Sequence, residues 1–281
     1  MKMSVEAFRR WESKSITLLG MSGVGKTYLS SRLRAAHWFH YSADYRIGTR
    51  YLSEPILDNI KRQAMQVPFL RDLLRSDSIY ISNNITVDNL SAVLTYLGKL
   101  GDPQRGGLAL TEFKHRQKQY RDAEVAAMLD VPEFIAKARN IYGYQHFIND
   151  SAGSLCELDD PGVLEVLAEH SLILYIEATE ENGRELLRRA EADPKPLYYR
   201  EEFLDQHLAL FMQELGVTRI EDIDPDRFVL WMFPRLFRAR VPRYEAIAAR
   251  YGYTVRADVL SPVQSEEAFL ACVENVLREQ A

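Results

Sequence analysis

Residues 20–27 read GMSGVGKT, and they directly follow an apolar run at residues 16–19. The stretch matches the pattern G-x-x-x-x-G-K-[ST] at every fixed position, and the helical pattern YLSSRLRAA comes after it. Glycines let such a loop wrap closely, so that backbone amides point at phosphate oxygens and the following helix directs its positive end at them. We therefore expect the phosphates of a nucleotide to be bound by Gly20, Ser22, Gly23, Val24, Gly25, Lys26 and Thr27.

Two side chains of this loop have expected roles of their own. Lys26 would reach the β- and γ-phosphates, and Thr27 would ligate Mg²⁺ through its hydroxyl. The same loop serves ATPases, GTPases and kinases, so the motif by itself leaves the reaction open.

Asp150, in the stretch HFINDSAGS, is the best candidate for a carboxylate that helps to hold the Mg²⁺. No second acid adjoins it, whereas a hydrolytic motor usually carries one acid for the metal and another to activate water. A guanine-reading N-K-x-D is also missing after residues 171–177, where IEATEENG follows. We therefore expect ATP rather than GTP, and transfer of the phosphoryl group rather than hydrolysis or a switch.

Asp44 supports transfer, because it follows a second strand-like segment in the stretch SADYRIGTR. The ends of parallel strands open on the same edge of a sheet, so Asp44 can face the phosphate loop across the binding crevice. A carboxylate there could accept a proton from an attacking hydroxyl or hold the acceptor. The alternatives for this residue are a helix N-cap or a solvated loop acid.

The elements that must position these residues are read from short apolar segments between long helical patterns. Segments rich in β-branched, aromatic or aliphatic residues occupy 15–20, 38–43, 145–149, 171–177 and 253–258. The alternation predicts βα units, a parallel sheet and an α/β fold. After the last segment, Ser265 is a suitable N-cap for a final helix packed on the sheet, with two glutamates in its first turn.

Two intervals are long for such a sheet. Residues 54–144 carry several helical patterns, and we expect a helical insertion that caps the acceptor side. Residues 200–238 carry further helical patterns and are expected to form a second insertion near a lid, with Pro234 ending or kinking its helix. No linker marks a domain boundary, so residues 1–281 are interpreted as one P-loop kinase-like domain.

Composition narrows the possible partners and the compartment. The formal net charge of -5 gives no global electrostatic reason to bind nucleic acid or an anionic membrane. No apolar run approaches the roughly 20 residues that span a bilayer. Cys156 and Cys272 form no metal-binding pattern and are expected to be small core residues in a reducing compartment. We expect a cytoplasmic protein that acts on a small molecule.

Four stretches in order, GMSGVGKT, SADYRIGTR, LLRRAEADPKPLYY and RVPRYEAIAARYGYTVRADV, resemble motifs of the shikimate kinase-like group of P-loop kinases. The resemblance implies a five-stranded parallel sheet in the order 2-3-1-4-5, flanked by helices, and the use of ATP and Mg²⁺. It implies that Asp44 faces the acceptor, with Arg50 as the basic residue that follows. Ser42 replaces the first acid of the family's D-x-D pair.

The same resemblance assigns roles to residues beyond the loop. Gly153 stands in a substrate-binding turn, Arg188 and Arg189 in a lid that closes on the phosphates, and Arg240 where the acceptor's acidic group would bind. The missing acid at position 42 and the reduced glycine turn imply that the acceptor differs from shikimate. These arginines also have purely structural alternatives. Arg188 and Arg189 could lie on a solvated helix face and pair with Glu185 or Glu191, and Arg240 could lie on a solvent-exposed surface.

Taken together, the residues favour an ATP-dependent kinase of a small hydroxylated metabolite. One alternative is a nucleotide-binding regulatory ATPase whose helical insertions bind a protein. Another is a toxin-like kinase of a nucleotide-sugar or a macromolecule.

Overall fold

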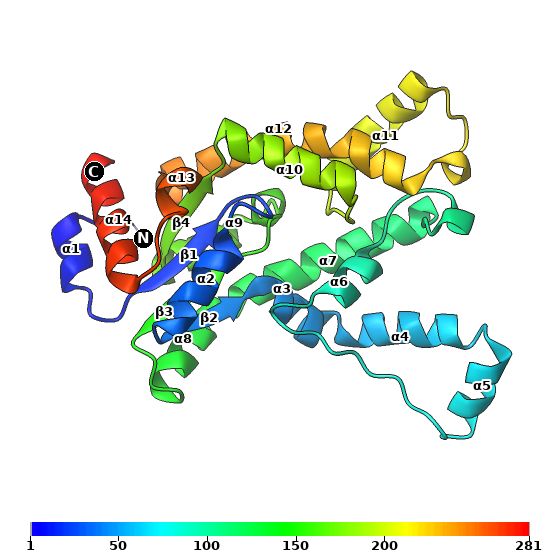
Figure 1. Ribbon diagram of the computed structural model, residues 1–281, viewed down its shortest axis with the longest axis horizontal. Coiled ribbons are helices and arrows are strands. Elements are labelled where there is room, and N and C mark those ends of the chain that lie inside the picture. Colours follow the sequence, from blue (N-terminus) through cyan, green and yellow to red (C-terminus); the bar gives the residue numbers. More distant parts are fainter. Residues whose placement is uncertain (1, 281) are drawn as a thin grey trace.

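The computed structural model describes residues 2–280 and contains a five-stranded parallel sheet (Figure 1). Its strands run in the spatial order β2-β3-β1-β4-β5, and every neighbouring pair is parallel. The strands are β1 (Ser15–Leu19), β2 (Trp38–Ser42), β3 (His146–Asp150), β4 (Leu172–Glu177) and β5 (Gly252–Arg256). This confirms the predicted fold class and strand order. Residues 1 and 281, which the predicted domain includes, lie outside the described residues.

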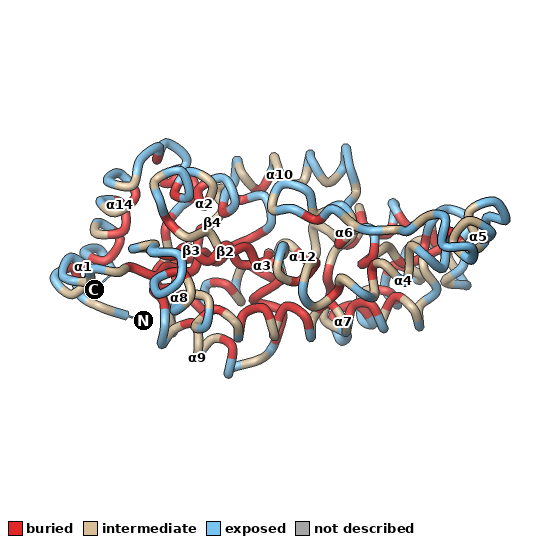
Figure 2. The backbone as a smooth tube through the Cα atoms, turned by 90° about the horizontal axis from the view of Figure 1, so that it is seen from below, coloured by how far each residue is buried: buried red, intermediate tan, exposed pale blue. Residues whose placement is uncertain are grey.

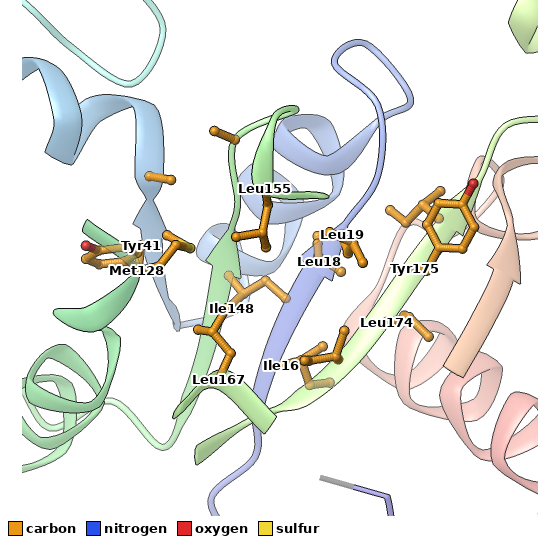
Figure 3. Packing of buried hydrophobic residues seen from close by; sticks show 14 of the residues in the cluster. Ile16, Leu18, Leu19, Tyr41, Met128, Ile148, Leu155, Leu167, Leu174 and Tyr175 are labelled. Carbon is orange, nitrogen blue, oxygen red and sulfur yellow. The ribbon is translucent and has the colours of Figure 1, made fainter. Parts of the chain in front are cut away.

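The main core lies on the sheet. Every residue of β1 is buried, because helices cover the sheet on both faces. Figure 3 shows Ile16 and Leu18 of β1 packed beside Ile148 of β3 and Leu174 of β4. The short helices near the sheet are α1 (Val5–Arg10), α2 (Lys26–Ala35), α3 (Ala43–Arg46), α9 (Pro161–His170), α13 (Ala257–Leu260) and α14 (Glu266–Glu279). Ser265 caps α14 by accepting a hydrogen bond from the amide of Ala268, as predicted.

The interval between β2 and β3 is helical. It contains a π-helical turn (Ile47–Tyr51), α4 (Ser53–Ala64), α5 (Pro68–Arg75), α6 (Ser91–Leu97), α7 (Leu110–Leu129) and α8 (Val131–Asn140). Figure 1 shows α4 and α5 leading away from the sheet, while α7 runs back toward it. The end of α7 joins the main core, where Met128 is fully buried. Whether these helices form a separate insertion stays a prediction.

The interval between β4 and β5 contains α10 (Glu180–Ala192), α11 (Glu201–Leu215) and α12 (Pro225–Tyr251). Pro234 was expected to end or kink its helix; it does not end it, because α12 runs for 27 residues and contains both Pro234 and Pro242, and the kink stays a prediction. A proline removes one backbone hydrogen bond and crowds the preceding turn. Here Met232 and Leu236 are buried on either side of it, and their packing holds the helix together.

A second hydrophobic core lies beyond the sheet and joins the two helical intervals (Figure 2). Phe113 of α7 packs there against Tyr199, which precedes α11. The buried residues of this second core are Leu100, Phe113, Tyr199, Phe203, Leu204, Leu208, Phe211, Ile223, Phe228, Met232 and Leu236. Because α7 and α12 each contribute to both cores, the distal helices are packed continuously onto the sheet.

Two expectations drawn from the composition can be compared with the structure. Within residues 2–280, no helix is both long and apolar enough to cross a membrane. Cys156 and Cys272 are buried with free thiols, as expected of core residues.

Candidate active site

The phosphate loop joins β1 to α2, and its conformation requires glycine. Gly20, Gly23 and Gly25 have φ angles of 149°, 83° and 112°, which side chains rarely allow. A Cβ atom on Gly20 would lie 2.8 Å from the carbonyl oxygen of Ile176, and one on Gly23 would lie 2.7 Å from Leu186. Gly25 is the N-cap of α2, so the positive end of this helix opens into the loop.

Lys26 is the first residue of α2, and its side chain is buried inside the loop. Its Nζ atom donates hydrogen bonds to the carbonyl oxygens of Gly20 (2.7 Å) and Met21 (3.0 Å). Burial lowers the pKa of Lys26, an effect that Asp150 and Asp44 oppose. The ammonium group is thus held where the loop would surround phosphate oxygens, and Thr27 follows it as an exposed residue.

Three strands end at the same level beside this loop. Asp150, the last residue of β3, is paired in register with Leu18 of β1 and with Ser42 of β2. Its carboxylate is buried, and one oxygen lies 3.5 Å from Nε2 of His40. Ser42 caps α3 by accepting a hydrogen bond from the amide of Tyr45. The cap is therefore Ser42 and not Asp44.

Asp44 lies in the first turn of α3 and is within electrostatic reach of Lys26 and Asp150. Burial raises the pKa of Asp44, Asp150 raises it further, and Lys26 lowers it. The hydroxyl of Tyr120, on α7, lies 3.1 Å from Oδ1 of Asp44 and donates a hydrogen bond to it. The expected convergence of Lys26, Asp44 and Asp150 on one edge of the sheet is therefore present.

Glu124 of α7 is a member of this cluster that the sequence analysis missed. Its side chain is fully buried, and Oε2 accepts a hydrogen bond of 2.5 Å from the hydroxyl of Ser154. Its second oxygen, Oε1, has no hydrogen-bond partner. Burial raises the pKa of Glu124 to about 8, and Asp44 contributes in the same direction. The available clue was helical spacing, because Tyr120 and Glu124 are four residues apart on the buried face of α7.

Gly153 and Arg240 join the phosphate loop to the rest of the site. The carbonyl oxygen of Gly153 accepts hydrogen bonds from Nη1 of Arg240 (2.9 Å) and the hydroxyl of Tyr244 (2.6 Å). A Cβ atom on Gly153 would lie 2.7 Å from the amide nitrogen of Ser22, so this turn rests directly on the loop. Arg240 is buried, and its Nη2 donates to the carbonyl oxygen of Tyr198. The structure thus gives Arg240 a positioning task within the protein.

The other predicted arginines lie outside this buried cluster. The side chains of Arg188 and Arg189 are 68% and 60% exposed, and both form ion pairs with Glu185. This is the pairing on a solvated helix face that the sequence left as the alternative. Arg50 is exposed on the π-helical turn.

A pocket of about 410 Å³ nevertheless connects the two lid arginines with the phosphate loop. Ser22 and Gly23 line one side of it, and Arg188 and Arg189 line another. Residues of α12 complete the wall, among them Phe233. Helix α10, helix α12 and the first part of the phosphate loop therefore line one pocket.

The oxygen donors at this site suit an Mg²⁺ ion that takes most of its ligands from a nucleotide and from water. In the part of the chain that the structure describes, no group of three or more His, Cys, Asp or Glu side chains could hold a metal ion. Mg²⁺ in such sites takes one or two protein oxygens, and phosphate and water supply the rest. The hydroxyl of Thr27 and the carboxylate of Asp150 are oxygen donors suited to this shared coordination.

No model of a protein family matches the chain, and no curated protein matches its sequence. The chain is similar to the solved structure of shikimate kinase from Bacteroides thetaiotaomicron, with a TM-score of 0.43, 14% identity and coverage of 94% of this chain and 98% of that one. It is also similar to shikimate kinase from Acinetobacter baumannii in complex with shikimate, with a TM-score of 0.41, 12% identity and coverage of 98% and 93%.

The fold itself rests on the strand order and the loop geometry. A parallel sheet in the order β2-β3-β1-β4-β5, with a glycine-rich loop between its central strand and the next helix, is the P-loop kinase fold implied by the sequence resemblance. The shikimate in the second solved structure belongs to that protein.

Proposed function

We propose that this chain is an ATP- and Mg²⁺-dependent phosphotransferase that phosphorylates a hydroxyl group of a small metabolite. The observation that supports it most is the meeting of Lys26, Asp44 and Asp150 where three parallel strands end. A hydrolytic motor usually carries two adjacent acids, for metal and for water, whereas here Ser151 follows Asp150 and the other acid, Asp44, comes from the helix that follows β2.

In this proposal the protein positions the reacting groups and stabilises the negative charge of the phosphates. Lys26 and the loop amides bind the β- and γ-phosphates and stabilise the negative charge that moves during transfer. Asp150 and Thr27 would hold Mg²⁺, which when bound would neutralise part of the negative charge of the phosphates. ATP supplies the phosphoryl group.

Asp44 receives the proton of the acceptor hydroxyl. The acceptor oxygen forms a bond to the γ-phosphorus, the bond from this phosphorus to the β–γ bridging oxygen breaks, and ADP leaves with the electron pair. The raised pKa of Asp44 makes it a stronger base than an ordinary aspartate. Tyr120, which donates a hydrogen bond to Asp44, orients the carboxylate.

The lid helix α10 acts by closing. Arg188 and Arg189 line a pocket with the phosphate loop, and in the proposal they exchange Glu185 for the phosphates when the nucleotide is bound. Closure excludes water and so limits wasteful hydrolysis.

The test is a screen of ATP consumption over hydroxylated metabolites, with product identified by mass spectrometry. We expect at least one acceptor to raise turnover in the wild type, and Lys26→Ala to abolish the gain. Asp44→Asn should lower acceptor-dependent turnover by about 10²- to 10⁴-fold, the usual contribution of a general base, while ATP binding persists. Glu169→Gln, on an exposed position of α9, is the matched control and should behave as wild type. If no acceptor raises ATP consumption above the basal rate, the proposal is wrong.

A regulatory ATPase is the second candidate, and one observation favours it. The acceptor side of Asp44 is covered by Tyr120, and the ring of Tyr198 stacks on Tyr120 with centroids 5.8 Å apart. Gln117 fastens the segment of Tyr198 to α7, because its side chain binds backbone atoms of Leu197 and Tyr199. In this alternative, ATP hydrolysis is slow and independent of any acceptor, and Asp44→Asn leaves it unchanged.

A further inference from the structure

The groups that α7 brings to the acceptor side are a phenol and a carboxyl. Tyr120 and Glu124 are one helical turn apart, and both are buried. Tyr120 donates to Asp44, and Glu124 accepts from Ser154 in the turn after β3. The charge of Asp44 acts on both side chains, so the three lie in one small region.

One oxygen in this region lacks a partner. Oε1 of Glu124 is buried and accepts no hydrogen bond, although the other oxygen of the same carboxyl is bonded. A buried polar atom without a partner destabilises the fold, so native proteins rarely keep one without a reason. A ligand that brings a hydrogen-bond donor to Oε1 would supply the missing bond.

The cation that the resemblance assigned to an acidic acceptor is already engaged. Nη1 and Nη2 of Arg240 donate to carbonyl oxygens of Gly153 and Tyr198, and its Nε lies 3.6 Å from the buried carboxylate of Glu157. An arginine that recognises a carboxylate or phosphate must present its planar edge to it. Both Nη atoms of Arg240 donate to backbone carbonyls, and Nε forms no hydrogen bond but faces Glu157, so the guanidinium has no free edge for two parallel hydrogen bonds.

Neighbouring arginines are engaged in the same way. Nε of Arg46, in α3, donates to Asp130, and Arg121, on α7, donates to the carbonyl oxygen of Leu158. Arg50 is exposed on the turn that follows α3. An acidic group placed beside Asp44 and Glu124 would therefore meet carboxyl groups and no arginine with a free edge, and Lys26, the cation that acts on both, is held by carbonyl oxygens of the phosphate loop.

We propose that Glu124 and Asp44 form the acceptor subsite, and that the acceptor is a polyol or amino-polyol without a carboxylate or phosphate group. Its hydroxyl or ammonium donors bind the free oxygen of Glu124, and the hydroxyl that reacts lies at Asp44. Glu124 is then the residue that selects the acceptor by its donors. This inference rests on the proposed phosphotransferase function.

The test uses matched acceptors that differ in one group: glucose, glucosamine and gluconate, and further sets built in the same way from other polyols. Acceptor affinity is measured by calorimetry on the full chain with Mg²⁺ and a non-hydrolysable ATP analogue, and turnover is measured separately with ATP. We expect neutral or amino members of at least one set to bind at least tenfold more tightly than the acid of that set.

Variants at position 124 test the role of the carboxyl. Glu124→Leu keeps the volume and removes both oxygens, and it should weaken binding of the acceptor at least tenfold. Glu124→Gln is a neutral isostere of the protonated carboxyl, and it should stay within about threefold of wild type for a neutral polyol, because its amide nitrogen can donate to the hydroxyl of Ser154 and leave its oxygen free for the acceptor. Glu169→Gln again serves as the control, and thermal unfolding of each variant shows that it is folded.

The outcomes separate the two proposals. If the acids bind as tightly as their neutral partners, if Glu124→Leu leaves acceptor affinity unchanged, or if no member of any set binds, the inference is overturned. If polyols bind in a manner that depends on Glu124 but no phosphorylated product forms, the acceptor subsite stands and the phosphotransferase function fails.

Discussion

Lys26, Asp44, Glu124, Asp150 and Arg240 lie in one region where the strands end, and their charges act on one another. Lys26 is stabilised by the carboxylates around it, and burial works against its ammonium form. Replacing a whole buried ion pair by neutral groups is tolerated better than removing one of its two charges. The charge that remains has no partner in a buried site, which is costly. The candidate catalytic residues therefore affect the stability of the fold as well as the proposed reaction.

The stability of the fold should depend on pH through Glu124. Its pKa is raised from 4.5 to about 8 in the folded state, so the folded chain binds this proton more tightly than the unfolded chain does. The contribution of Glu124 to the free energy of unfolding is then fully present below its unfolded pKa and is lost as pH rises from about 4.5 to about 8. Glu124→Gln carries no such proton and should lose less stability over this range, by on the order of a few kcal/mol.

Urea unfolding of wild type and Glu124→Gln, at about pH 5 and about pH 8, measures the difference. The raised pKa of Asp44 acts in the same direction and should leave a smaller slope in the variant. Equal pH dependence in the two proteins would contradict the assignment of a protonated Glu124.

At the scale of elements, the site is assembled from the ends of strands and the turn that carries Gly153. Register fixes Asp150 between the ends of β1 and β2, and the turn after β3 then rests on the phosphate loop. Arg240 and Tyr244 of α12 hold that turn through the carbonyl oxygen of Gly153. The loop is thus supported from outside by two residues of α12 that have no contact with the nucleotide in the proposal.

Gly153→Ala tests this support. The added Cβ atom would lie 2.7 Å from the amide nitrogen of Ser22, so either the loop or the turn has to shift. We expect ATP affinity to fall at least tenfold while the chain still folds, as measured by titration with a fluorescent nucleotide and by circular dichroism. Gly162→Ala, whose Cβ would meet only Asp160 at 3.3 Å, is the control. Unchanged affinity in Gly153→Ala would show that the turn gives way without disturbing the loop.

Much of this arrangement of elements could be predicted from the sequence, because strands and the phosphate loop leave regular residue patterns. Strands buried on both faces are short apolar runs, and the residues of the phosphate loop have fixed spacing. Both β1 and the loop can therefore be recognised in the sequence. The continuation of α12 through Pro234 was not, because it depends on burial of residues on either side of the proline. Glu124 was missed since it lies in a helix without a motif, and only packing brings it to Asp44 and Ser154.

The whole molecule is elongated, with the sheet at one end and helices reaching away from it (Figure 1). Two cores divide it, yet α7 contributes Phe113 to the second core and Met128 to the first. The helix α12 likewise contributes Phe228 to the second core and Tyr244 to the first. Helices that cross between cores transmit the loss of one to the other, so we expect the chain to unfold as one cooperative unit.

Phe113→Ala tests this cooperativity. The side chain is 1% exposed in the second core, and its loss should lower the free energy of unfolding by about 3–5 kcal/mol. Hydrogen exchange followed by mass spectrometry should then show protection falling together in α11 and in β4. If protection in β4 is unchanged while α11 exchanges rapidly, the helical intervals fold independently, and their prediction as appended insertions gains support.

The central position of β1 also sets the order of events during synthesis. Its partners are β3 and β4: Ser15 pairs with Phe147, and Ile16 pairs with Leu172. The N-terminal strand therefore leaves the ribosome long before either neighbour exists, and the chain between them must be closed as a large loop before the sheet can form. A nascent chain that stops before β3 carries every residue of the phosphate loop and still lacks the sheet that shapes it.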